Sequence, residues 1–358
     1  MNARTGKIDS CGNRFYFCTV IVAAVIALVT AQFPAWAKDR LTIGITNSAS
    51  DTPMFIAEKR GFFSDEGIEP EFVQFASATQ MIAPLSGGDL SVGAGAPGAG
   101  LYNATKREIA LRIVADKGSM PKNHGYLSLL VRKDLVDSGK VKSLADLKGL
   151  KIGDLSKQGS GDITLNEILK KGGLKFTDVE PLYMGAPQLA IALENKALDA
   201  TLITEPNLSL LVNRGTAVLF QRSDETYPNQ QLAVILFSEA LVKKNKDLAQ
   251  RFMNAYVRAL HVYNDAIQEG HLTGPGADEI VDLLIEKTNF KDRAMYRKII
   301  APGLNPNCHV NKAGLKSDFA FYSEMGWVDR TQDPDSIVDD SFCANAVAKV
   351  GQYGRAKK

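Results

Sequence analysis

The stretch that decides the fold reads Leu41-Thr42-Ile43-Gly44-Ile45 and continues, after one residue, as Asn47-Ser48-Ala49-Ser50-Asp51-Thr52-Pro53. Its first five residues are apolar or β-branched apart from one glycine, which is typical of a buried strand. Its second part ends in a threonine that can cap a helix and a proline that fits the first helical turn. The stretch therefore predicts a strand, a polar turn and a helix start.

The same succession recurs along the chain. Strands separated by helices favour mostly parallel sheets built from βαβ units, so we expect an α/β protein with two similar lobes in series. The predicted strands are residues 41–45, 72–75, 90–93 and 111–115, then 151–153, 179–183, 200–203 and 217–220. The predicted helix starts lie near Pro53, Ala78, Pro97, Asp162, Pro187 and Pro206.

Two longer apolar segments, 125–132 and 231–237, do not fit inside either lobe and bracket the second one. If both run between the lobes, lobe two is an insertion in lobe one and the lobes share a two-strand hinge. An amphipathic helix over 241–269 and shorter helices near 276–288, 291–300 and 311–325 would complete lobe one. The expected division is 38–128 with 232–346 for lobe one, 129–231 for lobe two, and 347–358 for a basic flexible tail.

The N-terminus has the pattern of a secretory signal peptide. Arg4, Lys7 and Arg14 precede an uncharged run over 15–34, and Ala35-Trp36-Ala37 follow it. Ala35 and Ala37 are small residues at the minus-three and minus-one positions. They predict cleavage after Ala37 and export to the periplasm. The run is near the ~20 apolar residues that span a bilayer, so an uncleaved anchor is the alternative.

Composition excludes several classes of function. Loss of residues 1–37 removes three basic residues and one acidic residue from totals of 42 and 40, which leaves the mature chain neutral and argues against nucleic acid as a partner. Only Cys308 and Cys343 remain as cysteines, either as a disulfide or as two buried thiols. We expect a monomer without metal or cofactor.

The strand-to-helix turns are the candidate binding elements, because ligands bind at the carboxyl ends of the strands in an open parallel sheet. Helix starts present free N–H groups and a partial positive charge, which together favour an anion. The hydroxyls of Ser48, Ser77, Thr79 and Ser160 could add directed hydrogen bonds. The same features also occur as plain helix caps.

Three charged residues follow predicted strand ends. Lys117 would suit an anion, whereas Asp116 and Glu205 would suit an amino or hydroxyl group, and the sequence leaves that conflict open. The histidines are scattered and none has the setting of a nucleophile and its base, so no catalytic residue is predicted. The glycine-rich run 93–98 contains Pro97 where a dinucleotide fingerprint needs its phosphate turn, so we reject that interpretation.

The motif over 53–63, Pro-Met-Phe-Ile-Ala-Glu-Lys-Arg-Gly-Phe-Phe, followed by Glu66-Gly67-Ile68, resembles the nitrate/sulfonate/taurine family of periplasmic binding proteins. The stretches 85–93, 113–119, 147–153 and 198–206 resemble the same family. The resemblance implies a two-lobed type II periplasmic binding protein fold. The ligand-binding residues that it implies are Ser48, Ser50, Asp51, Ser77, Thr79, Ala96, Asp116, Ser160, Gly161, Asp162 and Glu205.

The resemblance also implies a function and its partners. The chain would capture a small, anionic organic solute and deliver it to an ABC permease and its ATPase in the inner membrane. A related branch makes the pyrimidine precursor of thiamine with a cysteine-rich iron motif, and this chain has no cysteine between Cys18 and Cys308. An exported enzyme of that kind and a membrane-tethered sensor are the alternatives.

Overall fold

The computed structural model describes residues 1–3, 6, 38–107, 111–288 and 290–354. The chain divides into two compact units, Met1–Lys38 and Asp39–Lys358, and the account below concerns the second. The expected leader lies almost wholly outside the described residues, so its cleavage after Ala37 stays a prediction. Within the described part, no helix has both the length and the apolar character needed to cross a membrane.

The predicted lobe one is built on a five-stranded sheet in the order β2-β1-β3-β10-β4. Strands β2, β1 and β3 run parallel to one another, while β10 lies antiparallel between β3 and β4. All seven residues of β10 are buried, because helices cover both faces of the sheet at its centre. The strands are β1 (Asp39–Ile45), β2 (Ile68–Gln74), β3 (Val92–Gly95), β4 (Arg112–Ser119) and β10 (Gln231–Phe237).

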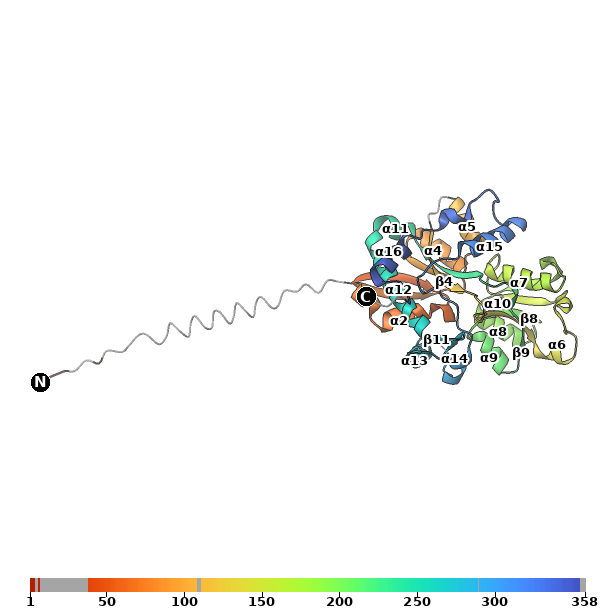
Figure 1. The fold of residues 1–358 in the computed structure, drawn as a ribbon, viewed down its shortest axis with the longest axis horizontal. Helices are drawn as coiled ribbons and strands as arrows, with labels where there is room; N and C mark the ends of the chain where they lie inside the picture. The colour runs from red at the N-terminus through yellow and green to blue at the C-terminus, as the bar shows by residue number, and fades with distance from the viewer. Residues whose placement is uncertain (4–5, 7–37, 108–110, 289, 355–358) are drawn as a thin grey trace. The chain divides into compact units, whose positions relative to one another are not determined.

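The predicted lobe two repeats this arrangement. Its sheet has the order β7-β6-β8-β5-β9, and β5 is the antiparallel strand between β8 and β9. Figure 1 shows α6, α7, α8 and α9 gathered around this sheet, apart from α2, α11, α12 and α16 of lobe one. The strands are β5 (Leu127–Arg132), β6 (Lys151–Asp154), β7 (Glu180–Tyr183), β8 (Ala200–Thr204) and β9 (Ala217–Arg222).

The two long segments expected to run between the lobes do not do so. Each lies inside one sheet, β5 in lobe two and β10 in lobe one. The chain crosses in the segments just before them, 120–126 and 223–230. The backbone N–H and C=O groups of a long, buried, apolar strand need hydrogen-bond partners on both sides. Such a strand is therefore placed inside a sheet.

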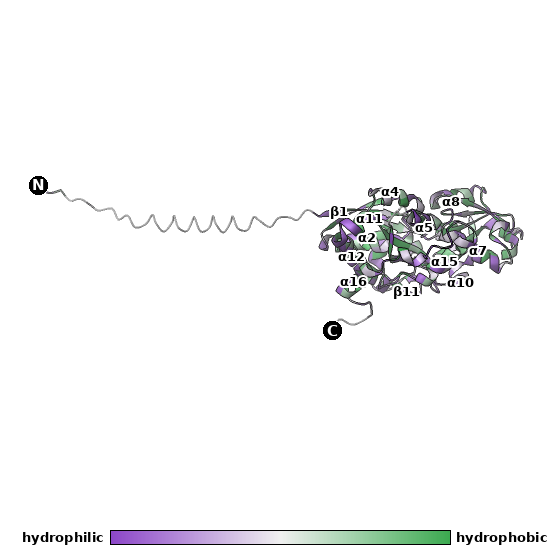
Figure 2. Cartoon of the chain, turned by 90° about the horizontal axis from the view of Figure 1, so that it is seen from above, coloured by the Kyte–Doolittle hydropathy of each residue, from purple (hydrophilic) through white to green (hydrophobic). Residues whose placement is uncertain are grey.

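The helices start where the turns predicted them. In Figure 2 the helices carry both hydrophilic and hydrophobic residues, as amphipathic helices do. The α-helices are α2 (Thr52–Lys59), α3 (Phe62–Asp65), α4 (Ile82–Gly87), α5 (Ala99–Lys106), α6 (Lys133–Asp137), α7 (Ser160–Lys171), α8 (Ala186–Glu194), α9 (Asn207–Asn213), α10 (Ser223–Thr226), α11 (Glu239–Lys244), α12 (Lys246–Asp265), α13 (Ala277–Lys287), α14 (Arg293–Lys298), α15 (Lys312–Glu324) and α16 (Ser341–Val350). Short 3-10 helices are η1 (Ala49–Asp51), η2 (Ala78–Met81), η3 (Leu144–Leu147), η4 (Phe176–Asp178) and η5 (Pro334–Ile337), and a small hairpin pairs β11 (Ile267–Gln268) with β12 (His271–Leu272).

The helical pattern over 241–269 forms two helices rather than one. The helix breaks at Asn245, whose φ of −134° is not helical, and α12 ends at Asp265. The buried face of α12 carries Phe252, Tyr256 and Leu260, and it packs in the core cluster that also contains β1 and α2 residues. The amphipathic pattern therefore predicted the buried face correctly, but the prediction of a single helix was wrong.

Helix α15 packs against both lobes, whereas the sequence placed it in lobe one alone. The ring of Phe319 lies 4.9 Å from that of Tyr102 on α5, centroid to centroid. Phe321 on the same helix lies 5.9 Å from Phe176 of η4 in lobe two. Aromatic residues on two faces of one helix let it bury surface on two neighbours, so α15 ties the lobes together beside the crossing segments.

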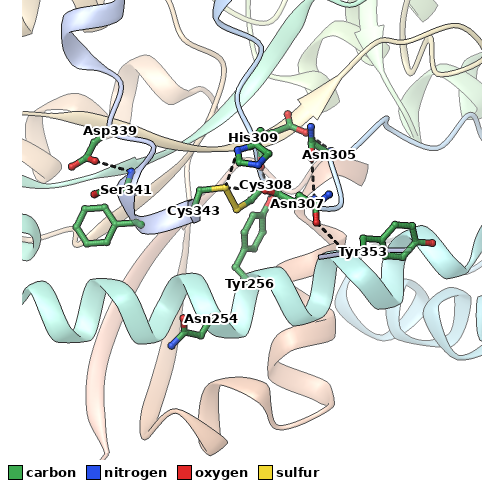
Figure 3. Close-up of a disulfide and its surroundings, with 12 residues drawn as sticks. Asn254, Tyr256, Asn305, Asn307, Cys308, His309, Asp339, Ser341, Cys343 and Tyr353 are labelled. Atoms are coloured by element: carbon green, nitrogen blue, oxygen red, sulfur yellow. Dashed lines mark hydrogen bonds between the residues drawn. A yellow bond between two sulfur atoms is a disulfide. The ribbon is translucent and has the colours of Figure 1, made fainter. Parts of the chain in front are cut away.

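Cys308 and Cys343 form a disulfide that fixes the C-terminal helix α16 to the loop after α14. Figure 3 shows Tyr256 of α12 beside this bond. The predicted flexible tail from residue 347 is wrong in its first part, because α16 continues to Val350 and Tyr353 donates a hydrogen bond to Asp265 at 2.9 Å. The apolar side chain of Val350 packs against the core of lobe one.

We expect the double substitution Cys308→Ser and Cys343→Ser to lower the free energy of unfolding. The disulfide closes a loop with a sequence separation of 35 residues. Loop-closure entropy then gives a loss of about 3 to 4 kcal/mol. Urea unfolding followed by circular dichroism would measure it, and reduced wild-type protein should match the double variant. An unchanged midpoint would contradict a stabilising role.

Candidate functional site

A cavity of about 680 Å³ lies between the two lobes. All six strand-to-helix turns singled out from the sequence contribute to its wall. Lobe one supplies residues after β1, β2 and β3, and lobe two supplies residues after β6, β7 and β8. The right-handed βαβ connections place these turns at one edge of each sheet, so the topology itself builds the cavity.

The expected binding residues divide into two groups. Ser48, Ser50, Ser77, Ala96 and Gly161 line the cavity. The remaining six are outside its lining, and they are Asp51, Thr79, Asp116, Ser160, Asp162 and Glu205.

Asp51 lies behind the lobe-one wall and forms a buried ion pair. Its Oδ1 lies 2.9 Å from Nζ of Lys117, and the two side chains are 0% and 1% exposed. Its Oδ2 accepts a hydrogen bond from the backbone N–H of Ser48 at 2.9 Å. The Lys117 ammonium lines the cavity and also donates to Oγ of Ser48 at 3.4 Å. A lysine at this depth needs such a partner, because burial without one disfavours its charge.

Asp162 lies behind the lobe-two wall at the start of α7. It accepts hydrogen bonds from the backbone N–H of Gln158 at 2.7 Å and from the hydroxyl of Tyr183 at 3.0 Å. Its neighbour Asp154, the last residue of β6, lines the cavity. Burial raises the pKa of Asp162 to about 7 and raises that of Asp154 well above its usual range. Because the two carboxyls interact, at most one of them is ionised near neutral pH.

Ser160 joins the lobes instead of facing the cavity. Its hydroxyl donates a hydrogen bond to the carbonyl of Pro97 in lobe one at 3.1 Å. Beside it, the N–H of Ala99 donates to the carbonyl of Gln158 at 2.9 Å, and elsewhere the N–H of Ala49 donates to the carbonyl of Glu205 at 3.3 Å. These bonds hold the lobes in direct contact next to the cavity.

Asp116 and Glu205 are placed by the structure outside the cavity. Asp116 accepts hydrogen bonds from the N–H of Asn305, the N–H of Gly118 and the side-chain amide of Gln231. Glu205 accepts them from Ser209 and from the N–H of Ile300, so it holds the start of α9 and ties lobe two to the segment after α14. Both carboxylates use their acceptor positions within the chain. Burial raises the pKa of Asp116 to about 6 and that of Glu205 to about 7.

Thr79 is exposed. Of the aromatic residues near the turns, some line the cavity and others are buried in the core. Phe75 lines the cavity, as a wall for an apolar part of a solute would. Phe55 and Tyr102 are buried in the lobe-one packing instead. Phe290 is a further wall residue that the sequence did not indicate.

Sequence reasoning missed three charged wall residues. Asp154 directly follows the predicted strand 151–153, so the rule that selected Asp116 and Glu205 could have found it. Arg214 and Glu194 also line the cavity and form an ion pair at 3.0 Å. They lie on and just after helices, where no turn motif marks them. In the described ranges, no three His, Cys, Asp or Glu side chains gather as a metal site would require.

Comparison with known proteins agrees with this geometry. Residues 48–267, more than half of the chain, match the model of the NMT1/THI5-like family. The chain belongs to the NMT1/THI5-like family. A relative from Bacillus subtilis named "Putative aliphatic sulfonates-binding protein" is 28% identical over 333 residues, which cover 88% of this chain and 90% of that protein. The resemblance to the sulfonate and nitrate binding proteins is thereby confirmed.

Solved structures share the fold. A Bordetella bronchiseptica protein has a TM-score of 0.69 and 26% identity, and the match covers 88% of this chain and 98% of that one. The periplasmic nitrate-binding protein of Synechocystis has a TM-score of 0.74 and 13% identity, covering 88% and 89%. A desulfurization enzyme also has this fold, with a TM-score of 0.59, 17% identity and coverage of 87% and 99%. The predicted two-lobed type II periplasmic binding protein fold is confirmed, and the fold alone does not separate receptors from enzymes.

The buried acids predict how stability changes with pH. The folded-state pKa is raised to about 6 in Asp116, about 7 in Asp162 and Glu205, and about 8 in Asp318. A raised carboxyl pKa means that the folded chain binds more protons than the unfolded one, so its stabilising effect is lost as pH rises through the folded pKa. We therefore expect the free energy of unfolding to fall between pH 5 and pH 8.

Urea unfolding at pH 5, 6.5 and 8 would measure this slope. Glu205→Gln keeps one of the two acceptor oxygens but cannot ionise, and it should reduce the change in the free energy of unfolding between pH 5 and pH 8 by roughly 2 to 3 kcal/mol. The control Asp137→Asn changes an exposed carboxyl of α6 and should leave the slope as it is. A wild-type protein that becomes more stable from pH 5 to pH 8 would show that these acids are ionised in the fold.

Proposed function

We propose that the protein is the periplasmic solute-binding receptor of an ABC-type uptake transporter and that it binds a small, anionic organic solute in the cavity between its lobes. The observation that carries this proposal is a cavity walled by turns of both lobes. Its volume of about 680 Å³ lies within the ~300–1,000 Å³ of pockets that hold small organic molecules. A bare inorganic anion would leave most of that space unfilled.

Two features support an acidic group on the solute. An ammonium has three N–H donors, and among the described residues Asp51 and Ser48 account for two of those of Lys117. The helix α8 starts at the wall, with its N-cap Gly185 and the following Ala186 and Pro187 all lining the cavity. Free N–H groups and the helix dipole favour negative charge at such a start.

The rest of the wall supports an organic solute with an apolar part. Phe75, Leu127, Leu232 and Phe290 line the cavity together with the charged and hydroxyl side chains. Apolar wall surface gains free energy only when the solute covers it with apolar surface of its own. The Bacillus subtilis relative is named for aliphatic sulfonates, which combine these two properties.

Transport follows from binding between lobes. A solute that touches both lobes stabilises the form in which they are joined, and a permease can distinguish that form from the open one. The partners are then a membrane permease and its ATPase. Two alternative functions, an exported enzyme and a tethered sensor, have separate tests. Turnover of a bound compound would indicate an exported enzyme, and a mass that retains residues 1–37 would indicate a tethered sensor.

A cavity-filling substitution tests the proposal. Calorimetry of the mature protein against carboxylates, sulfonates, nitrate and pyrimidines should identify a binder. In Ala96→Tyr the new ring occupies the cavity wall, and we expect binding to weaken by about a hundredfold or more, equivalent to about 2.8 kcal/mol. Ala145→Tyr places the same ring on the exposed 3-10 helix η3 and should bind as the wild type does. Failure of every compound to bind would contradict the receptor function.

A further inference from the structure

Asp318 is a buried acid that lies where the helix α15 meets the second crossing segment. The residue is 1% exposed. Its Oδ1 accepts a hydrogen bond from the hydroxyl of Tyr227 at 2.9 Å, and its Oδ2 lies 3.4 Å from Nε2 of Gln230. Tyr227 and Gln230 both belong to the crossing 223–230. None of these three residues lines the cavity between the lobes, so the cluster is separate from the solute site.

Gln230 connects this acid to lobe two. Its Nε2 donates a hydrogen bond to the carbonyl of Ser160, the first residue of α7, at 2.9 Å. Its Oε1 accepts a hydrogen bond from the hydroxyl of Thr164, one turn further along α7, at 2.6 Å. The side chain is 1% exposed, so it makes these contacts away from water. One buried amide therefore links Asp318 on α15 to the start of α7.

Tyr322 connects the same stretch of α15 to lobe one. It follows Asp318 by one helical turn, and its hydroxyl donates a hydrogen bond to the carbonyl of Pro97 at 3.0 Å. That carbonyl also accepts the hydrogen bond from Ser160 that joins the lobes. A helix that packs against both lobes loses one of these contacts when the lobes separate. The burial of Asp318 therefore depends on the joined arrangement, and separation lets water reach its carboxyl.

The electrostatics of the joined form favour a proton on Asp318. In the part of the chain that the structure describes, no basic side chain forms an ion pair with it. Burial raises its pKa to about 8, and the negative charge of Glu167 on α7 raises this pKa as well. Glu167 is itself paired with Lys170 at 2.9 Å. A carboxylate in a dry place without a cation is costly, so the joined lobes hold the acid in its neutral form.

The other ionisable groups around Asp318 keep their charge state between pH 6 and pH 8. Strand β10, which also packs against α15, has no ionisable side chain. Lys316 on α15 is paired with Asp335 of η5 at 2.7 Å. Three tyrosines stay neutral because burial raises the pKa of each above its usual range. They are Tyr227 of the crossing, Tyr102 of α5 and Tyr322 of α15.

We propose that Asp318 is a proton-binding site that couples closure of the two lobes to pH. With its proton the side chain can stay buried at the junction, so protonation favours the joined form. Without the proton the carboxylate favours the separated form, in which water solvates it. This device lies outside the cavity, and it goes beyond the proposed function because it needs no solute.

The size of the effect follows from the two environments of the carboxyl. In water an aspartate side chain has a pKa of about 4. Between that value and the higher pKa of the buried acid, the joined form binds more protons than the separated form. A rise in pH therefore shifts the equilibrium toward the separated form. We expect the ratio of joined to separated molecules to fall at least about tenfold between pH 6 and pH 8.

A distance measured between the lobes in the empty protein tests the inference. Spin labels can be attached to the mature chain through Ser86→Cys on α4 and Asn195→Cys after α8, which are exposed positions of different lobes. Cys308 and Cys343 are held in their disulfide and do not take the label. Double electron–electron resonance at pH 6, 7 and 8 gives the distance distribution. The population with the shorter distance should shrink as pH rises.

Two variants assign the effect to Asp318. Asp318→Asn cannot ionise, and its Nδ2 can donate to the Tyr227 oxygen as the protonated acid does. It should keep at pH 8 the joined fraction that it has at pH 6. Tyr227→Phe removes a donor that stabilises the carboxylate, so the transition should move to higher pH. The control Asp137→Asn, on an exposed carboxyl of lobe two, should keep the wild-type dependence. Circular dichroism at each pH would check that every variant is folded.

The contradicting outcomes are distinct from those of the proposed function. A joined fraction that is constant from pH 6 to pH 8 in the wild type would overturn the inference. A pH dependence that survives in Asp318→Asn would also overturn it, because other acids would then be its cause. Neither result bears on solute binding, since the measurement contains no solute.

Discussion

Strand β10 pairs antiparallel with β3 and β4 at once, and the position of the cavity depends on that pairing. The chain reaches β10 only after it has built all of lobe two, because β5 to β9 come first in sequence. Each crossing, 120–126 or 223–230, therefore joins an edge strand of one sheet, β4 or β9, to a strand of the other sheet that is paired on both sides, β5 or β10. Fixed crossings place the carboxyl edges of the two sheets opposite each other, and the six turns meet there.

Buried acids are the main electrostatic cost of this arrangement. Asp116, Asp162, Glu205 and Asp318 each have a raised pKa, with burial as its largest cause. Three of them receive hydrogen bonds that hold elements together away from the cavity wall, namely Asp116, Glu205 and Asp318. Asp318, for example, accepts from Tyr227 near the second crossing. These acids hold backbone segments in place away from the cavity wall, whereas Asp154 is a buried acid that lines the cavity.

Much of the fold could be predicted from the period of the strands and from the turn residues. Both sheets and the helix starts followed from local pattern, because β-branched runs and proline caps act over a few residues. The pairing of β5 and β10 inside sheets could not, since strand neighbours are set by contacts between residues far apart in sequence. The position of α15 between the lobes could not be predicted for the same reason. Phe319 and Phe321 indicate from the sequence that the helix is buried, but not which elements it packs against.

The turns that line the cavity could be located from the sequence, whereas only five of the eleven side chains expected to bind the solute lie in its wall. Asp116 and Lys117 are adjacent on β4, and successive residues of a strand point to opposite faces. Lys117 therefore lines the cavity while Asp116 binds Asn305 on the other side. A strand end can be found from sequence, but the face of each residue there depends on the register of the whole sheet.

The two walls of the cavity offer different chemistry, and this difference bears on closure. Lobe one presents the ammonium of Lys117, and lobe two presents the carboxyl of Asp154. On the proposed function, a solute that contacts only one wall can bind while the lobes remain apart. A solute that contacts both walls gains its second set of contacts only when the lobes meet, so its differential affinity for the joined form is larger. A ligand shifts a conformational equilibrium only by that differential affinity. Contact with both walls therefore favours the joined form over the open one, which the proposed function requires.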